Sequence, residues 1–322
     1  MKIQPLDFEK PIVELTKTLE EIKKHSKAQE IDLDPEVKRI EDKIEKTKLE
    51  IYANLTAWQR VQISRHPARP YMLDYINLAF SDFIELHGDR LFGDDKAMPG
   101  GLATIGGYKC VVIGHQKGRD LKENLKRTFG SAHPEGYRKA LRLMRMAEKF
   151  HLPVITLVDT PGAYPGIGAE ERHISEAIAV NLREMMVLKT PIISVILGEG
   201  GSGGALGIAV ADRVLMFENS YYSVISPEGC AAILWKHRSH APEAAEALKL
   251  TARDLAELKL IDEVIPEPVG GAHYDHAQTA ANFTQMITKH LKKLVDMPVD
   301  KMLAQRYEKF RRIGEIEGGD SV

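Results

Sequence analysis

The stretch that most constrains this chain is a run of glycines that follows a short apolar segment. Residues 192–197 are mostly β-branched and apolar, as in a parallel strand buried on both faces. Five glycines then fall between positions 198 and 204, and small residues follow at 205–211. Glycine loses more conformational freedom on folding than other residues, so this density predicts positive φ angles or backbone close to a ligand. We therefore expect a strand, a tight turn and the start of a helix.

Such a turn has a chemical use. Its free peptide N–H groups, with the positive end of a helix dipole behind them, can point at a single oxygen atom. If that oxygen gains negative charge during a reaction, the turn acts as an oxyanion hole. This is the function that we predict for the segment.

Other interpretations of the same glycines stay open. Gly198-x-Gly200-x-x-Gly203 fits the dinucleotide-binding fingerprint with Glu218 as the ribose-binding acid, although about ten residues before Asp212 make a short helix for that motif. Gly200-x-Ser202-x-Gly204 fits the nucleophile elbow of serine hydrolases. The possible partners of Ser202 in a hydrolase are Asp212, Asp262, His237 and His273. A purely structural turn is a further alternative, whereas a Walker loop is excluded because no Gly-Lys-Ser/Thr follows.

Composition narrows the class of protein. The chain has 322 residues, 43% of them hydrophobic, and a formal net charge of −2, which implies no general affinity for nucleic acid. No apolar run approaches the roughly 20 residues of a membrane span, and the first residues lack a signal-peptide core. The two cysteines, Cys110 and Cys230, are too few for a disulfide framework or a four-cysteine zinc site. We expect a cytoplasmic protein that binds no metal and no membrane.

The order of elements predicts a largely parallel sheet. A buried strand at 153–158 leads into a loop rich in Gly and Pro at 159–168, a helix at 170–188 and the strand at 192–197. This is a βαβ unit, in which both Gly-rich loops lie at the carboxyl ends of neighbouring strands, where ligands bind. Upstream we expect a helix over 73–86 and a β-hairpin over 101–114.

Two further features flank this sheet. Residues 1–55 are highly charged and carry two apolar stripes, with a break near 32–35, which predicts a helical hairpin. Ahead of the helix that opens at Pro134, basic residues crowd the chain and form a candidate phosphate-binding patch. The members of this patch are Lys117, Arg119, Lys122, Lys126 and Arg127.

Five motifs together resemble a known family, the α subunit of bacterial acetyl-CoA carboxylase carboxyltransferase. They occur in the family's order over roughly residues 5–290, with one departure at Thr128, where the family pattern has Asn. The motifs are His-Gln-Lys-Gly-Arg (115–119), Pro-Glu-Gly-Tyr-Arg-Lys-Ala (134–140), Asp-Thr-Pro-Gly-Ala-Tyr-Pro-Gly (159–166), Gly-Glu-Gly-Gly-Ser-Gly-Gly-Ala-Leu (198–206) and Tyr-Ser-Val-Ile-Ser-Pro-Glu-Gly-Cys (222–230).

The resemblance implies a fold and an assembly. The fold would be a crotonase-like α/β domain of repeated ββα units around a parallel sheet, at 56–295. The helical hairpin at 1–55 precedes it, and a C-terminal helix and tail at 296–322 follow. The family enzyme is an α₂β₂ heterotetramer whose β subunit carries a zinc ribbon, and it works with biotin carboxylase and the biotin carboxyl carrier protein.

The resemblance also implies a reaction, namely transfer of a carboxyl group from carboxybiotin to acetyl-CoA. The product is malonyl-CoA, in the first committed step of fatty acid synthesis; another acyl-CoA is the alternative substrate. We expect the amides of Gly203, Gly204 and Ala205 to bind the ureido oxygen of biotin. The residues expected to line the biotin site are Gly200, Gly201, Thr160, Pro161, Gly162, Ala163 and Tyr164. In this interpretation Ser202 is a small turn residue, and the basic patch serves the CoA phosphates.

Overall fold

The computed structural model describes residues 4–29 and 33–315 and is built around one sheet of eight strands. The strands run in the spatial order β1-β2-β3-β4-β5-β6-β8, with β7 paired to the end of β5. Strands β3, β4, β5, β6 and β8 are parallel, while β1 and β2 extend the sheet in antiparallel fashion. The strand bounds are β1 Ser81–Glu85, β2 Gly100–Ile105, β3 Tyr108–Gly114, β4 Val154–Thr160, β5 Ile192–Gly201, β6 Arg213–Phe217, β7 Tyr221–Ser223 and β8 Glu263–Ile265.

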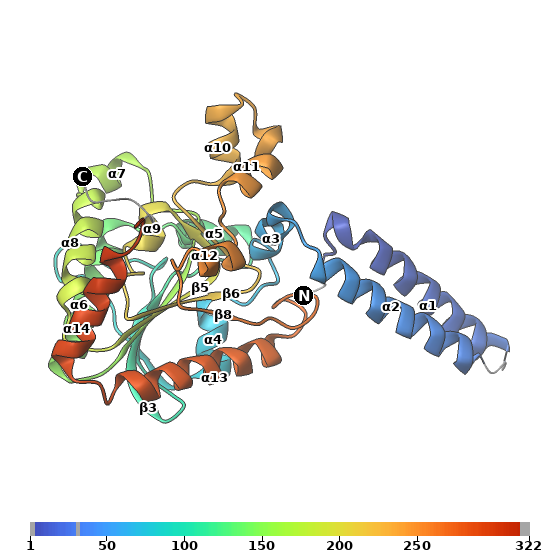
Figure 1. Ribbon diagram of the computed structural model, residues 1–322, viewed down its shortest axis with the longest axis horizontal. Helices are drawn as coiled ribbons and strands as arrows, with labels where there is room; N and C mark the ends of the chain where they lie inside the picture. The colour runs from blue at the N-terminus through green and yellow to red at the C-terminus, as the bar shows by residue number, and fades with distance from the viewer. Residues whose placement is uncertain (1–3, 30–32, 316–322) are drawn as a thin grey trace.

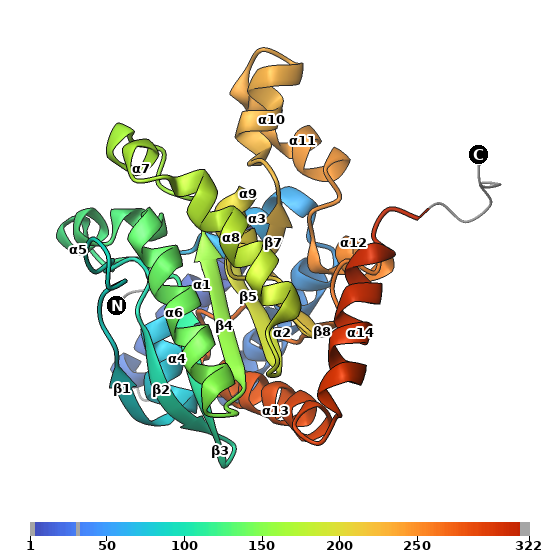
Figure 2. The same cartoon turned by 90° about the vertical axis from the view of Figure 1, so that its left-hand side faces the viewer.

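Helices cover both faces of this sheet. Every residue of β4 and β5 is buried, because apolar side chains on alternate sides feed two separate cores. On one face the apolar sides of α6 (Pro134–Lys149) and α8 (Ile174–Val187) form the larger core, and Figure 2 shows both helices in front of the sheet. On the other face lie α4 (Met72–Ala79) and α13 (His276–Leu294). The predicted α/β architecture with a parallel sheet is confirmed.

The N-terminal helices stand apart from this body. Helices α1 (Lys10–Gln29) and α2 (Asp34–Ala53) lie side by side and project away from the sheet in Figure 1, so the predicted helical hairpin is present. The start of the predicted break, at residue 32, lies outside the described residues. The base of the hairpin is fastened by Glu9, whose carboxylate accepts hydrogen bonds from the hydroxyls of Tyr52 (2.8 Å) and Tyr274 (3.1 Å).

Short helices gather where the parallel strands end. In Figure 2, α5, α7, α9 and α10 surround the upper edge of the sheet, which is the carboxyl end of β4 and β5. The bounds of the remaining α-helices are α3 Ala57–Ser64, α5 Leu121–Lys126, α7 Ile167–Glu171, α9 Ser202–Leu206, α10 Pro227–Leu234, α11 Ala241–Ala247, α12 Ala252–Glu257 and α14 Val299–Arg311. Three 3₁₀ turns lie at Asp7–Glu9, Thr128–Gly130 and Arg238–His240. None of the helices in the described ranges is long and apolar enough to cross a bilayer.

Helix α14 is tied to the body through a buried arginine. The guanidinium of Arg306 binds both carboxylate oxygens of Asp212, at 2.8 and 2.7 Å, and donates to the carbonyl oxygens of Met185 and Leu188. A fully buried guanidinium is tolerated because all of its donors meet acceptors. The C-terminal helix is therefore part of the packed structure.

Two helical predictions were wrong in extent. The helix predicted over 73–86 ends at Ala79, and residues 81–85 form the edge strand β1 instead. This strand passes so close to β2 that a Cβ at Gly101 would lie 2.0 Å from the carbonyl oxygen of Ile84. The helix predicted over 170–188 is divided into α7 and α8, because His173 adopts a left-handed conformation between them.

Candidate functional site

The glycine segment forms a sharp junction between a strand and a helix. Strand β5 continues through Gly201, and α9 begins at Ser202 and spans five residues. The expected tight turn over all five glycines is therefore wrong, because the first three belong to the strand. None of the five glycines has a positive φ; the left-handed residue at the junction is Ser202, with φ of 55°.

The glycines are needed for close contact with the neighbouring loop. A Cβ on Gly201 would lie 2.2 Å from the carbonyl oxygen of Pro161, and one on Gly204 would lie 2.3 Å from the nitrogen of Ala163. Both distances are far below van der Waals contact, so only glycine lets the two backbones meet. The structure thus brings Thr160, Pro161, Gly162 and Ala163 of the predicted wall against the predicted oxyanion loop. The ring of Tyr164, the last residue of that wall, stacks on His133 instead.

Gly203 differs from its neighbours because a Cβ there would make only ordinary van der Waals contacts. The nearest heavy atoms to a Cβ built there belong to Ile178, at 3.9 Å. Within the described chain, no hydrogen bond joins the amide nitrogen of Gly203 or Gly204 to a carbonyl outside the helix. The first N–H groups of a helix lack intrahelical acceptors, so these two amides can bind a ligand atom. Ala205 has no exposed surface, and its amide is the least accessible of the three predicted donors.

Side chains behind the helix fix the orientation of its peptide groups. The hydroxyl of Tyr137 donates to the carbonyl oxygen of Gly204 at 3.0 Å. The amide of Asn181 donates to the carbonyl oxygens of Tyr137 and Gly207, each at 3.0 Å. Helices α6 and α8 thereby hold the first turn of α9 in place, which is the pre-organisation that an oxyanion hole requires.

A mostly apolar cavity of about 310 Å³ opens beside Gly203. Residues from α9, β7 and α14 line it, among them Leu206, Tyr222 and Phe310. Burial raises the pKa of Tyr222 to about 12, so its hydroxyl stays protonated near neutral pH. Free amides at the edge of an apolar cavity stabilise developing negative charge more strongly than the same amides in water.

A buried ion-pair cluster lies directly beneath the glycine segment. The ammonium of Lys117 binds Asp159 at 2.7 Å and Glu199 at 2.8 Å, so it bridges the ends of β4 and β5. Arg65 binds Glu199 at 2.8 Å and also pairs with Glu228 on α10. The amide of Glu199 donates to Asp159 at 2.9 Å. We call Arg65, Lys117, Asp159, Glu199 and Glu228 the charge cluster.

Glu199 and Lys117 of the charge cluster are both ionised at neutral pH. Burial raises the pKa of Glu199, but the cations of Lys117 and Arg65 outweigh burial and lower it to about 2. Burial lowers the pKa of Lys117, and the two carboxylates more than restore it, so the pKa lies above its usual value. The nearby His115 is fully buried, and burial together with Lys117 lowers its pKa to about 3. His115 is therefore neutral.

The five residues of the predicted basic patch do not form one surface in the structure. Lys117 belongs to the charge cluster, so it is not available to a phosphate. Arg119 pairs with Asp74, stacks on the ring of Tyr71 and donates to the carbonyl oxygen of Arg69 at 2.9 Å. The side chains of Lys122 and Lys126 are exposed on α5, while Arg127 donates to the carbonyl oxygen of Lys96.

The residues proposed for a hydrolase do not assemble around Ser202. Asp212 is bound to Arg306, and Asp262 to Lys309. His237 contacts Ser239, whereas His273 stacks on His66 with ring centroids 4.0 Å apart. No hydrogen bond joins Ser202 to a histidine in the described part of the chain. Glu218, the acid required by the dinucleotide interpretation, faces Arg60 at 3.9 Å and follows a helix of five residues.

Sequence reasoning missed the charge cluster, although one signal was available. Asp159 and Glu199 each lie near the carboxyl end of a buried and mostly apolar strand, and an acid at that position needs a cation. Within residues 4–29 and 33–315, no group of three or more His, Cys, Asp or Glu is arranged to hold a metal ion.

Comparison with solved structures shows that the chain shares its fold with a transcarboxylase and with a malonate decarboxylase. Transcarboxylase 12S superimposes with a TM-score of 0.59 at 20% identity, over 71% of this chain and 42% of that one. A Pseudomonas malonate decarboxylase hetero-tetramer gives 0.56 at 16% identity, over 69% of this chain and 91% of that one. At such low identity these two likenesses concern the fold alone.

Comparison of sequences gives the family. A family model described as acetyl co-enzyme A carboxylase carboxyltransferase-like matches residues 5–314. Acetyl-coenzyme A carboxylase carboxyl transferase subunit alpha of Geobacter metallireducens is 58% identical over 311 residues, 97% of this chain and 98% of the relative. The protein of the same name from Thermus thermophilus is 54% identical, over 96% and 98% of the two chains. The chain belongs to the acetyl-CoA carboxylase carboxyltransferase α-subunit family, as the five motifs predicted.

Proposed function

We propose that this chain is the α half of a carboxyltransferase that moves a carboxyl group from carboxybiotin to acetyl-CoA, giving malonyl-CoA. The observation that carries the proposal is the junction at Ser202, where the amides of Gly203 and Gly204 have no acceptor outside their helix and Gly203 borders an apolar cavity. The catalytic domain is proposed to span residues 56–295, with the hairpin at 1–55 before it and the segment at 296–322, whose helix α14 packs against this domain, after it.

The fit of biotin to this site rests on the residues present. The ring system of biotin is apolar apart from its ureido group, which suits a mostly apolar cavity with amide donors at one edge. We propose that Gly203 and Gly204, with Ala205 behind them, donate to the ureido oxygen. The loop Thr160–Tyr164 forms the facing wall, and Gly200 and Gly201 form the floor.

The chain contributes charge stabilisation rather than an acid or a base. When bound, carboxybiotin supplies the carboxyl group, and its freed ureido nitrogen supplies a base for the methyl proton. The backbone amides hold the ureido oxygen while it becomes more negative, and they need no reorganisation because Tyr137 and Asn181 fix the helix. A single oxyanion donor typically lowers the barrier by about 3 kcal/mol.

The partner subunit is proposed to dock at the same edge of the sheet. Apolar side chains there are exposed without cover from this chain, including Leu121 and Leu125 of α5 and Ile233 and Leu234 of α10. Exposed apolar groups beside an active site indicate a protein interface. The relatives are named subunit alpha, so we propose a β subunit on this surface, in an α₂β₂ assembly supplied by biotin carboxylase and the biotin carboxyl carrier protein.

The location is proposed to be the cytoplasm. Cys110 and Cys230 are both buried and free, which is usual where thiols stay reduced. The exposed Lys122 and Lys126 stay a proposal for the CoA phosphates, because they lie on α5, the helix that also carries Leu121 and Leu125 of the proposed interface.

The test is reconstitution with the β subunit. We expect the mixed subunits to convert malonyl-CoA and biocytin to acetyl-CoA and carboxybiocytin, and each subunit alone to be inactive. Faster carboxyl transfer from methylmalonyl-CoA than from malonyl-CoA would show that propionyl-CoA, and not acetyl-CoA, is the preferred acceptor. Labelling of Ser202 by a fluorophosphonate probe, with no carboxyl transfer in the mixture, would contradict the proposal and support a hydrolase.

A further inference from the structure

A second cavity, of about 790 Å³, lies on the outer face of the molecule between α6, α8 and the loop at 86–95. Five arginines line it: Arg90, Arg138, Arg142, Arg145 and Arg172. The acidic residues of its lining are Asp89 and Glu176. The cavity is thus strongly basic, and it is separate from the cavity beside Gly203.

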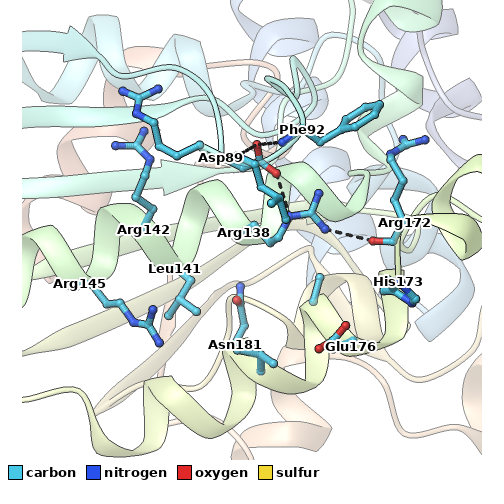
Figure 3. A pocket seen from close by; sticks show the side chains of 14 residues that line it. Asp89, Phe92, Arg138, Leu141, Arg142, Arg145, Arg172, His173, Glu176 and Asn181 are labelled. Atoms are coloured by element: carbon cyan, nitrogen blue, oxygen red, sulfur yellow. Dashed lines mark hydrogen bonds and ion pairs between the residues drawn. The ribbon is translucent and has the colours of Figure 1, made fainter.

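Three of the five arginines in this cavity already form ion pairs with carboxylates. Asp89 accepts hydrogen bonds from the amides of Leu91, Phe92 and Gly93 and from the guanidinium of Arg138 at 2.8 Å, as Figure 3 shows in part. Arg172 binds Glu135 through two nitrogens, at 3.1 and 3.0 Å. Arg145 binds Glu184 at 2.9 Å. Asp89 therefore has little capacity left to neutralise further cations.

Arg90 and Arg142 are different, because backbone carbonyls are their partners. Both guanidiniums donate to the carbonyl oxygen of His87, at 2.9 and 3.2 Å, and Arg142 also donates to Gly88 at 3.0 Å. Within the described residues, no carboxylate lies within ion-pair distance of either side chain. Burial and the nearby charge of Arg90 lower the pKa of Arg142, which reflects two like charges held together.

The loop is built to keep this arrangement. Arg90 has a φ of 67°, a left-handed conformation that is strained for a non-glycine residue. The three amide hydrogen bonds to Asp89 hold the loop in that shape. Asp94 and Asp89 are near enough to act on Arg142 electrostatically, but neither forms an ion pair with it. Two converging guanidiniums without an ion-paired carboxylate, on a backbone fixed in a strained conformation, are expected where an anion binds.

We infer that this cavity binds a small phosphorylated molecule, with Arg90 and Arg142 as the phosphate ligands. Guanidinium groups offer paired N–H donors that match phosphate oxygens, and two of them suit a group carrying two negative charges. Leu91 and Phe92 stand exposed on the same loop, and one face of Phe92 is covered by Arg172 at 4.4 Å. The aromatic ring offers a stacking surface for a nucleoside base joined to the phosphates.

The test measures binding to the full-length chain by isothermal titration calorimetry at low salt, with tripolyphosphate and ADP as separate probes. We expect saturable binding at one site. Arg90→Gln and Arg142→Gln should each weaken it about tenfold or more, since a hydrogen bond to a charged group is worth about 1.5–3 kcal/mol. Arg253→Gln removes the same charge from the exposed pair with Glu257 on α12, and binding should be unchanged.

The two probes distinguish the sources of the phosphate. Equal affinities indicate that an inorganic polyphosphate suffices, while tighter ADP binding that is lost in Phe92→Ala indicates a nucleotide. Arg142→Lys retains the charge and shows whether weakened binding in Arg142→Gln comes from misfolding. The inference is overturned if neither probe saturates, if Arg90→Gln binds like the parent chain, or if the arginine variants lose assembly with the partner subunit while binding both probes normally.

Discussion

The glycine segment and the charge cluster lie at the same strand ends, but the first offers backbone amide groups and the second consists of charged side chains. The first presents backbone amides to a cavity and has almost no side chains. The second consists of charged side chains paired with one another, of which Lys117, Asp159 and Glu199 are buried and Arg65 and Glu228 are partly exposed. The amides are proposed to do the chemistry, while Lys117 and Arg65 hold the ends of β4 and β5 at the spacing that the chemistry needs.

This difference means that the two regions should fail in different ways. Damage to the charge cluster leaves buried charges without partners, so it should reduce the stability of the whole domain. Damage to the exposed face of the glycine segment adds atoms where substrate binds, so it should reduce turnover and leave stability intact. Variants that break this separation would show that the division of roles is wrong.

The largest effect is expected from Lys117→Met. It leaves Asp159 and Glu199 buried without the ammonium that joins them, and breaking a buried pair in this way costs about 3–5 kcal/mol. Urea unfolding followed by circular dichroism measures the loss. Lys122→Met, on the exposed face of α5, is the matched control and should change the free energy of unfolding by under about 0.5 kcal/mol. Equal stability of the two variants would contradict the role given to the cluster.

The next largest effect is expected from Gly204→Ala compared with Gly203→Ala. The Cβ of the first would overlap the backbone at Ala163, whereas that of the second meets nothing closer than 3.9 Å. Overpacking of a rigid contact costs about 1–3 kcal/mol, so Gly204→Ala should lower the melting temperature by several degrees and Gly203→Ala should not. Thermal denaturation of both proteins checks this, and a reversed order would show that the loops are not in contact.

A smaller effect is expected from acid. The folded pKa of Glu199, about 2, lies below its ordinary value of 4.5, so the unfolded chain takes up the proton first as pH falls. Its contribution to stability is complete above pH 4.5 and is lost progressively between pH 4.5 and about 2. Urea unfolding at several pH values should show a shallower decline for Glu199→Gln than for the parent chain. Parallel declines would mean that Glu199 is not held ionised by its neighbours.

The smallest effect is expected from Ser202→Gly. Glycine adopts the φ of 55° without strain, so the free energy of unfolding should change by less than about 1 kcal/mol. Carboxyl transfer with the β subunit should continue at close to the parent rate. Loss of that activity would show that the hydroxyl of Ser202 takes part in the reaction, and that backbone amides alone do not account for catalysis at this site.

The sequence predicted the glycine segment well and the charge cluster poorly, for a physical reason. The glycines are contiguous, and their density requires a special backbone environment that local reasoning can recognise. The cluster joins Arg65, Lys117, Asp159, Glu199 and Glu228, which come together only after the sheet forms. Lys117 and Arg119 were grouped with α5 because they are near in sequence, yet β3 directs Lys117 into the interior.

The same limit explains the errors in detail. The reason for the glycines was predicted as positive φ or contact with a ligand, whereas three-dimensional packing against Pro161 and Ala163 accounts for Gly201 and Gly204. The break at His173 and the edge strand β1 depend on contacts with residues distant in the chain. The arginine cavity has the same origin, since its loop and its two helices are separated by about 50 and 90 residues.

The most direct test of the account is turnover of Gly203→Val in the complex with the β subunit. A Cβ at this position would meet no heavy atom closer than Ile178 at 3.9 Å, so we expect unchanged melting temperature and assembly, with kcat for carboxyl transfer reduced about 100-fold or more. A variant that folds, assembles and transfers carboxyl groups at the parent rate would show that the amides at the start of α9 do not bind the reacting group.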